Sequence, residues 1–131
     1  LNNITFAYNN IEMELPSNIG NAVTLRLINF GNNKISGTIP ESISTLSNLF
    51  GILLNNNQLS GNLPPHFENL VELQQLTLGV NNLSGNISSI GQCTQLQSLD
   101  LSDNNFSGTL DILSSLTELS VITLNGNSFS G

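Results

Sequence analysis

Residues 32–40, NNKISGTIP, form a motif that the chain repeats. Close copies follow at 56–64 (NNQLSGNLP), 81–88 (NNLSGNIS), 104–110 (NNFSGTL) and 126–131 (GNSFSG). Self-similarity at a fixed period is the sequence signature of a repeat architecture, in which each unit buries its apolar edge only against its neighbours. The repeat therefore decides the fold.

The aligned copies share the frame Leu-x-x-Leu-x-Leu-x-x-Asn-x-Leu-x-Gly-x-Ile-Pro. The frame begins at six leucines that are spaced by 24, 24, 24, 23 and 23 residues: Leu1, Leu25, Leu49, Leu73, Leu96 and Leu119. We expect one repeat domain over residues 1–131, without a capping motif before the first repeat or after the last. Because the sequence opens inside a repeat, it is expected to be a segment of a longer solenoid.

Two apolar periods divide each copy. The Leu-x-Leu core alternates, as in Ile28 and Phe30, which predicts a short strand. Beyond Pro40 the apolar residues recur every third position, as in Ile43 and Leu46, which favours a 3-10 or irregular helical return. Each turn should therefore comprise a strand, a bend, a second short extended piece and a return, and six stacked turns should form one parallel sheet of six strands.

The first asparagine of the frame is present in every copy. It lies where the backbone must bend between two buried leucines, and a buried backbone group without a partner costs about 1–3 kcal/mol. A carboxamide offers both donors and an acceptor, so stacked asparagines can satisfy the bend and bond their neighbours. The predicted structural ladder consists of Asn9, Asn33, Asn57, Asn81, Asn104 and Asn127.

The pattern resembles the leucine-rich repeat family, in particular its plant-type subclass, whose Leu-Ser-Gly-x-Ile-Pro mark reads ISGTIP at 35–40 and LSGNLP at 59–64. The resemblance implies an α/β fold: a right-handed solenoid of about six turns with a short parallel sheet on the concave side and 3-10 or irregular helical returns on the convex side. Members include receptor-kinase ectodomains and inhibitors of cell-wall-degrading enzymes, which bind proteins or peptides on the concave sheet. Three departures are Ser88 and Asp111 in place of proline, the shorter later repeats, and the absence of paired-cysteine caps.

The charge composition excludes several partners. Charged residues make up 8% of the chain, against roughly 25% in an average domain, and the net charge is −7 with only Arg26 and Lys34 basic. Nucleic acid and anionic lipid surfaces require several basic contacts. No apolar run approaches the roughly 20 residues of a membrane span, so no membrane insertion is expected in this segment.

The expected ligand surface is the concave sheet. Its candidate contact residues are Tyr8, Asn29, Asn32, Leu53, Asn55, Thr77, Asp100, Asp103 and Thr123. Recognition hot spots are enriched in Trp, Tyr and Arg, and this surface offers only Tyr8, so a solvated face without a dedicated ligand remains an alternative. Asp100 and Asp103 are interpreted as a solvated pair and not as a metal site.

No residues form a catalytic or cofactor-binding pattern. His66 stands alone next to two prolines, and Cys93 falls in a column of apolar residues, where it is expected to be a small core residue. With no phosphate loop, zinc spacing or nucleophile elbow, the sequence predicts no catalytic residue, no metal and no cofactor.

Four Asn-x-Ser/Thr sequons are candidate N-glycosylation sites: Asn3, Asn82, Asn86 and Asn105. Together with the low charge and the family resemblance they favour an extracellular or cell-surface protein. Asn82, Asn86 and Asn105 are expected at exposed turn positions, whereas a glycan on Asn3 would lie on the concave face.

Two functional hypotheses follow. The first is a non-catalytic binding module that recognises a protein, a peptide or a glycan on the concave sheet. The second is a structural or adhesive spacer whose uncapped ends stack on one another to form filaments. An ice-binding role through Thr5, Thr77 and Thr123 is disfavoured because their column is interrupted by other residue types.

Overall fold

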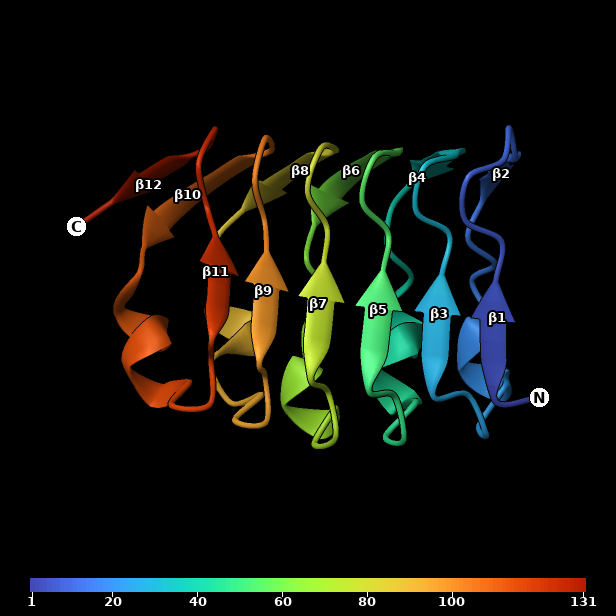
Figure 1. The fold of residues 1–131 in the computed structure, drawn as a ribbon, viewed down its shortest axis with the longest axis horizontal. Coiled ribbons are helices and arrows are strands. Elements are labelled where there is room, and N and C mark those ends of the chain that lie inside the picture. The colour runs from blue at the N-terminus through green and yellow to red at the C-terminus, as the bar shows by residue number, and fades with distance from the viewer.

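The computed structural model describes residues 1–131 as a solenoid of six turns with two parallel sheets (Figure 1). The first sheet is the predicted one and has one strand from each turn. Its strands in spatial order are β1 (Asn3–Thr5), β3 (Leu27–Asn29), β5 (Gly51–Leu53), β7 (Gln75–Thr77), β9 (Ser98–Asp100) and β11 (Val121–Thr123). Figure 1 shows these strands side by side and in the same direction across the front of the molecule.

The second extended pieces also pair, into a sheet that the sequence pattern did not predict. Its strands are β2 (Glu12–Glu14), β4 (Lys34–Gly37), β6 (Gln58–Asn62), β8 (Asn82–Gly85), β10 (Asn105–Thr109) and β12 (Ser128–Ser130). First-sheet partners follow the repeat period, as in Asn3 opposite Leu27, whereas second-sheet partners are two residues closer in sequence, as in Ser60 opposite Asn82. A shift of two residues preserves which side chains point inward.

Short 3-10 helices form the returns, as the apolar period of three predicted. They are η1 (Ile19–Asn21), η2 (Glu41–Thr45), η3 (Phe67–Asn69), η4 (Ser88–Ile90) and η5 (Asp111–Ser115). None of the helices has the length and apolar character needed to cross a bilayer. The returns pack against one another in places: Ser42 Oγ donates a 2.8 Å hydrogen bond to the carbonyl of Ser17 in the preceding turn.

A single apolar core of 28 buried residues runs along the solenoid axis between the two sheets and the returns. Side chains of the middle turns, such as Ile52 and Leu76, are fully buried, because a neighbour covers them on both sides. In the outermost turns, Phe6 at the position of Leu54 is 52% exposed, and Ile122 at the position of Ile52 is 46% exposed. Burial thus depends on stacking, as expected for a repeat protein.

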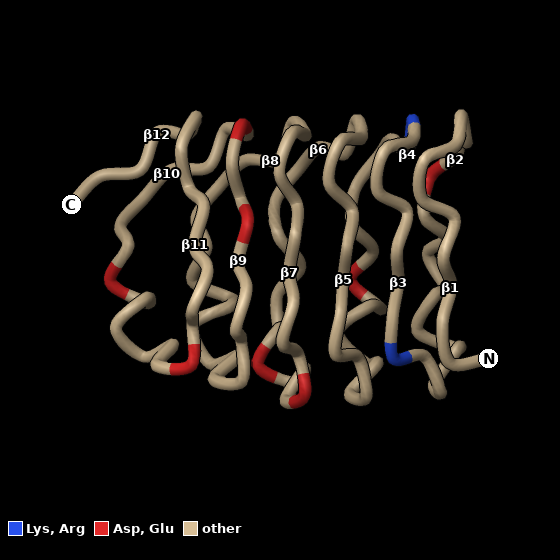
Figure 2. Tube along the Cα trace, in the orientation of Figure 1, with Lys and Arg blue, Asp and Glu red and all other residues tan.

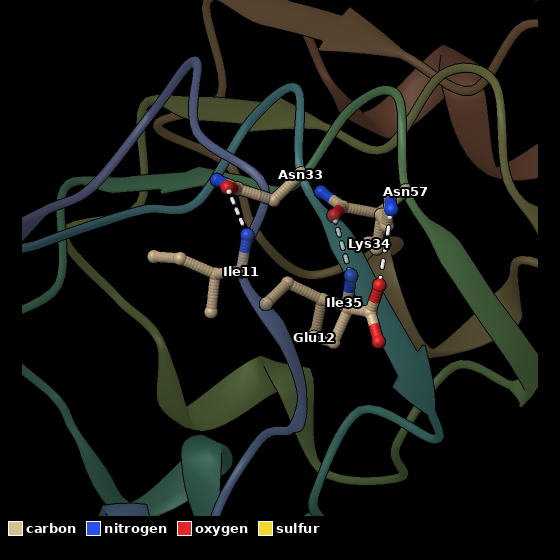
Figure 3. A network of polar contacts seen from close by, with 6 residues as sticks. All are labelled: Ile11, Glu12, Asn33, Lys34, Ile35 and Asn57. Atoms are coloured by element: carbon tan, nitrogen blue, oxygen red, sulfur yellow. Dashed lines mark hydrogen bonds and ion pairs between the residues drawn. The ribbon is translucent and has the colours of Figure 1, made fainter.

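The frame asparagines bridge the backbones of neighbouring turns (Figure 3). The Oδ1 of Asn57 accepts a 2.9 Å hydrogen bond from the Ile35 amide of the preceding turn, and its Nδ2 donates to the Phe30 carbonyl of that turn at 2.9 Å and to the Leu54 carbonyl of its own turn at 3.1 Å. Asn33 makes the same kind of bond to Ile11, at 3.1 Å.

The same arrangement recurs at Asn81, Asn104 and Asn127, whose Oδ1 atoms accept from the amides of the preceding turns at 2.9 Å. These side chains bond backbone groups of the adjacent turn and not one another. Asn9 lies in the first turn and donates only to carbonyls of its own turn, those of Phe6 and Ala7.

Replacing Asn57 by leucine should lower the free energy of unfolding by at least about 2 kcal/mol, because an amide and carbonyls in the bend lose their partners. Asn81→Leu should behave alike. Urea denaturation measures the change.

Two substitutions serve as controls. Asn9→Leu removes a ladder residue that bonds only carbonyls of its own turn. Lys34→Ala removes only an exposed ion pair with Glu12, at 3.0 Å, of a kind worth about 0–1 kcal/mol. Both should cost less than Asn57→Leu. Equal losses in all the variants would contradict a role of the ladder in closing the bends.

Candidate functional site: the first-sheet face

We define the first-sheet face as the outward side of the first sheet together with the segments that run from its strands to the bends. In each inner strand the middle residue is buried, as Ile28 is, and its two neighbours point outward. All nine candidate contact residues lie in this surface. Tyr8 and Asp103 are exposed, and the partly exposed ones are Asn29, Asn32, Leu53, Asn55, Thr77, Asp100 and Thr123.

Several of these polar side chains fold back on their own strands. Asn29 Oδ1 accepts a hydrogen bond from the Gly31 amide at 3.1 Å. Asp100 Oδ1 accepts from both the amide and the hydroxyl of Ser102, at 2.9 and 2.6 Å. These contacts orient the two side chains and leave Asp100 Oδ2 without a hydrogen-bond partner.

Glycines let side chains of neighbouring strands lie flat across this face. A Cβ on Gly79 would come within 2.9 Å of both carboxylate oxygens of Asp100, so the carboxylate lies where a larger residue would stand. A Cβ on Gly51 would meet Leu27 Cδ1 at 2.7 Å. Leu27 in β3 and Leu53 in β5 are apolar side chains of the second and third turns within a mostly polar face.

A column of left-handed residues forms the rim of the face, one in each turn just before the frame asparagine. Its members and their φ angles are Tyr8 (59°), Asn32 (60°), Asn56 (56°), Val80 (58°), Asp103 (50°) and Gly126 (72°). Asparagine, aspartate and glycine tolerate this conformation, whereas for other residues it costs roughly 1–2 kcal/mol.

Tyr8 and Val80 adopt this unfavourable conformation and are also exposed, by 82% and 46%. Val80 was not among the sequence candidates. The available signal was its residue type, since valine is unusual in a column that otherwise holds mostly asparagine, aspartate and glycine. The backbone strain that makes it notable is visible only in the structure.

Charge is distributed unevenly along the solenoid (Figure 2). Both basic residues, Arg26 and Lys34, lie in the first two turns, and the Arg26 guanidinium stacks over the Phe50 ring at 5.7 Å from its centroid. From residue 42 to the end the chain has six acidic residues and no basic one. Because Asp100 and Asp103 lie on the first-sheet face, its later turns favour a cationic group.

His66 and Cys93 lie away from this face. His66 Nδ1 contacts Glu68 Oε1 at 3.0 Å on the surface, and this hydrogen bond lowers the pKa of Glu68. Cys93 is 1% exposed and its thiol donates to the Phe67 carbonyl at 3.2 Å, while burial raises the pKa of the thiol to about 12. No group of three or more His, Cys, Asp or Glu side chains in the structure could hold a metal ion.

The four sequon asparagines are all exposed. Asn3 lies in β1 on the first-sheet face. Asn82 and Asn105 are exposed as expected but begin β8 and β10 in the second sheet, so their expected turn positions were wrong; Asn86 follows β8 directly.

The fold and this face define a repeat solenoid with a continuous sheet on one side. The Leucine Rich Repeat family model matches residues 24–46, 48–70 and 95–119, which is more than half of the chain. The chain therefore belongs to the leucine-rich repeat family, and its repeats are of the plant type. The comparison with curated protein sequences found no match.

Solved structures of receptor ectodomains resemble the chain closely. The ectodomain of the Arabidopsis thaliana membrane receptor kinase GASSHO1/SCHENGEN3, solved with CASPARIAN STRIP INTEGRITY FACTOR 2, is 37% identical with a TM-score of 0.94, over 98% of this chain and 16% of that one. The Arabidopsis receptor kinase HAESA ectodomain, solved with an IDA peptide hormone, is 35% identical with a TM-score of 0.92, over 98% of this chain and 22% of that one.

The likeness extends beyond plants. The Leptospira interrogans protein LIC12759 is 28% identical with a TM-score of 0.87, over 99% of this chain and 32% of that one. The present chain thus spans between about a sixth and a third of the length of these three proteins.

Val80→Asn should raise the free energy of unfolding by about 1 kcal/mol, because asparagine accepts the left-handed backbone that valine resists. Val71→Asn is the matched control, since Val71 is 58% exposed without a positive φ, and it should change stability by less than about 0.5 kcal/mol. Urea unfolding of both variants gives the comparison. A Val80→Asn protein no more stable than the parent would show that the valine side chain compensates for its strained backbone.

Proposed function

We propose that this chain is part of the ligand-binding ectodomain of an extracellular or cell-surface protein, and that its first-sheet face binds an extended peptide without catalysis. The observation that carries the proposal is the match of nearly the whole chain to ectodomains that were solved with a peptide hormone or a named protein factor. Protein or peptide recognition is therefore the activity to which this scaffold is best suited.

The chemistry of the face favours a particular kind of peptide. Leu27 and Leu53 offer an apolar contact in the second and third turns, and Asp100 and Asp103 offer negative charge in the fifth. A segment with an apolar residue followed along the solenoid axis by a lysine or arginine complements both areas. A glycan is a poorer fit, because Tyr8 is the one exposed aromatic residue among the contact candidates.

The face of this segment is small. Six turns at about 4.8 Å spacing, each contributing about five residues of strand and following segment at about 3.3 Å per residue, span roughly 400 Å². A standard recognition surface takes about 800 Å² from each partner. A ligand of ordinary size therefore extends over further turns, and this segment alone should bind it weakly.

A second candidate function, end-to-end stacking as a spacer or filament unit, is favoured by one observation. A hollow of about 330 Å³ opens in the first turn and is lined mainly by apolar side chains: Ile4, Phe6, Ile11, Met13, Pro16, Ile19 and Phe30. The exposed Val121 and Ile122 of the last turn are apolar as well. Stacked copies would bury these surfaces and continue both sheets.

Panning a multivalent library of linear peptides on the immobilised 131-residue chain tests the peptide proposal, because multivalent display recovers weak binders. Peptides that combine an apolar residue with lysine or arginine should be enriched. Leu53→Asp should weaken their binding at least about tenfold, which is 1.4 kcal/mol.

Val71→Asp adds the same charge to an exposed valine outside the first-sheet face and should leave binding unchanged. Enrichment of no peptides, or of peptides that bind both variants equally, contradicts the proposal. Light scattering over a range of protein concentrations accompanies the assay: a constant monomer mass removes the stacking candidate, and mass that grows with concentration favours it over the peptide proposal.

A further inference from the structure

In two strands of the second sheet, the middle residue of a sequon faces the core and the residues on either side of it face outward. In β8, Leu83 is fully buried, so Asn82 and Ser84 on either side of it point outward. In β10, the buried Phe106 does the same for Asn105 and Ser107. The residue between asparagine and serine is thus the core residue, and both residues that a glycosyltransferase must recognise face solvent.

A third sequon lies beside them. Ile87 is 1% exposed, and the flanking Asn86 and Ser88 are exposed at the end of β8. Asn86 Cβ would lie 3.2 Å from a Cβ placed on Gly108 of β10. The three sequons therefore gather on one side of the solenoid, over β8 and β10, which Figure 1 shows behind the first sheet.

The hydrogen bonds separate these asparagines from the ladder. Each inner ladder residue uses its Nδ2 to hold carbonyls of two turns, as Asn81 does for Leu54 and Leu78 at 3.0 and 2.9 Å. The Nδ2 atoms of the three sequon asparagines make no hydrogen bond; Asn86 uses only its Oδ1, which accepts from the Ser88 amide and hydroxyl at 3.0 and 2.6 Å. Substitution on Nδ2 therefore removes no structural contact.

We propose that Asn82, Asn86 and Asn105 carry N-linked oligosaccharides and that the second sheet over β8 and β10 is a glycan-bearing face. In the transfer, Nδ2 forms a bond to C1 of an oligosaccharide carried on a lipid pyrophosphate. The bond from C1 to the pyrophosphate oxygen breaks, the lipid pyrophosphate leaves, and Nδ2 loses one proton. The transferase and its lipid-linked donor belong to the secretory pathway, so the assignment rests on the proposed extracellular location.

This placement keeps the glycans on a different face of the solenoid from the proposed peptide-binding surface. Glycans on these residues project from the second sheet and leave the first-sheet face open. Asn3 stands outside the assignment, because it lies in β1 on the first-sheet face, where a sugar would cover the surface beside Thr5 and Leu27.

To test the proposal, the 131-residue chain carrying Asn3→Gln is fused to a signal peptide and expressed in eukaryotic cells. The signal peptide directs it into the secretory pathway. Digestion of the secreted protein with peptide N-glycosidase in heavy-oxygen water converts each formerly glycosylated asparagine to labelled aspartate, which mass spectrometry locates. The label is expected at Asn82, Asn86 and Asn105. Ser84→Ala, Ser88→Ala and Ser107→Ala should each remove one glycan, which lowers the apparent mass on a gel by one step. Each should also remove the label of its own sequon only.

The third turn supplies a matched gain-of-site control, since Gln58-Leu59-Ser60 occupies the same position in β6 with a buried leucine in the middle. Gln58→Asn should add a fourth labelled site. Label at fewer than two of the three native sites in the secreted protein overturns the glycan-bearing face. Secretion is imposed by the signal peptide, and the peptide panning is carried out on the chain produced in bacteria, which carries no N-glycan. A failure here is therefore distinguishable from a failure of the proposed function.

Discussion

The rest of the structure depends on how a buried bend finds partners for its backbone. In every turn the chain leaves the first sheet, bends and enters the second, and the bend withdraws amides and carbonyls from water. Asn57 holds both ends of the bend in the preceding turn, the Phe30 carbonyl and the Ile35 amide, while it also bonds the Leu54 carbonyl of its own turn. A carboxamide is the side chain that can donate and accept at once in this way.

These asparagine hydrogen bonds explain the difference in register between the two sheets. Because each asparagine reaches the amide two positions beyond the preceding turn's own asparagine, it fixes where the second strands meet, two residues out of step with the first sheet. The same bend requires a left-handed residue just before the asparagine, which places Tyr8 and Val80 on the rim of the first-sheet face. Architecture and candidate binding surface are thus consequences of one local geometry.

The periodic part of the fold could be predicted from the sequence, and the less regular part could not. Alternation at Ile28 and Phe30 indicated the first sheet, and the period of three at Ile43 and Leu46 indicated the 3-10 returns. The second sheet was missed because its strands are built from asparagine, serine and glycine, which have low strand propensity. They pair because stacking places them side by side.

The candidate face was predictable as a set of positions but not as a set of available groups. Spacing places Asp100 on the surface, but only the structure shows that Ser102 donates hydrogen bonds to one of its carboxylate oxygens. Val80 differs in residue type from the rest of its column, but its positive φ leaves no direct trace in sequence. The ladder asparagines and the sequon asparagines adjoin in the chain, as Asn81 and Asn82 do, and their hydrogen bonds distinguish them.

Native-state hydrogen exchange tests the central claim most directly. Five bend amides donate to the ladder asparagine of the following turn: those of Ile11, Ile35, Leu59, Leu83 and Phe106. If the carboxamides close the bends, these amides exchange as slowly as those of the first-sheet strands. Exchange at the rate of solvent-exposed loop amides would show that the bends are closed by something other than the asparagine side chains.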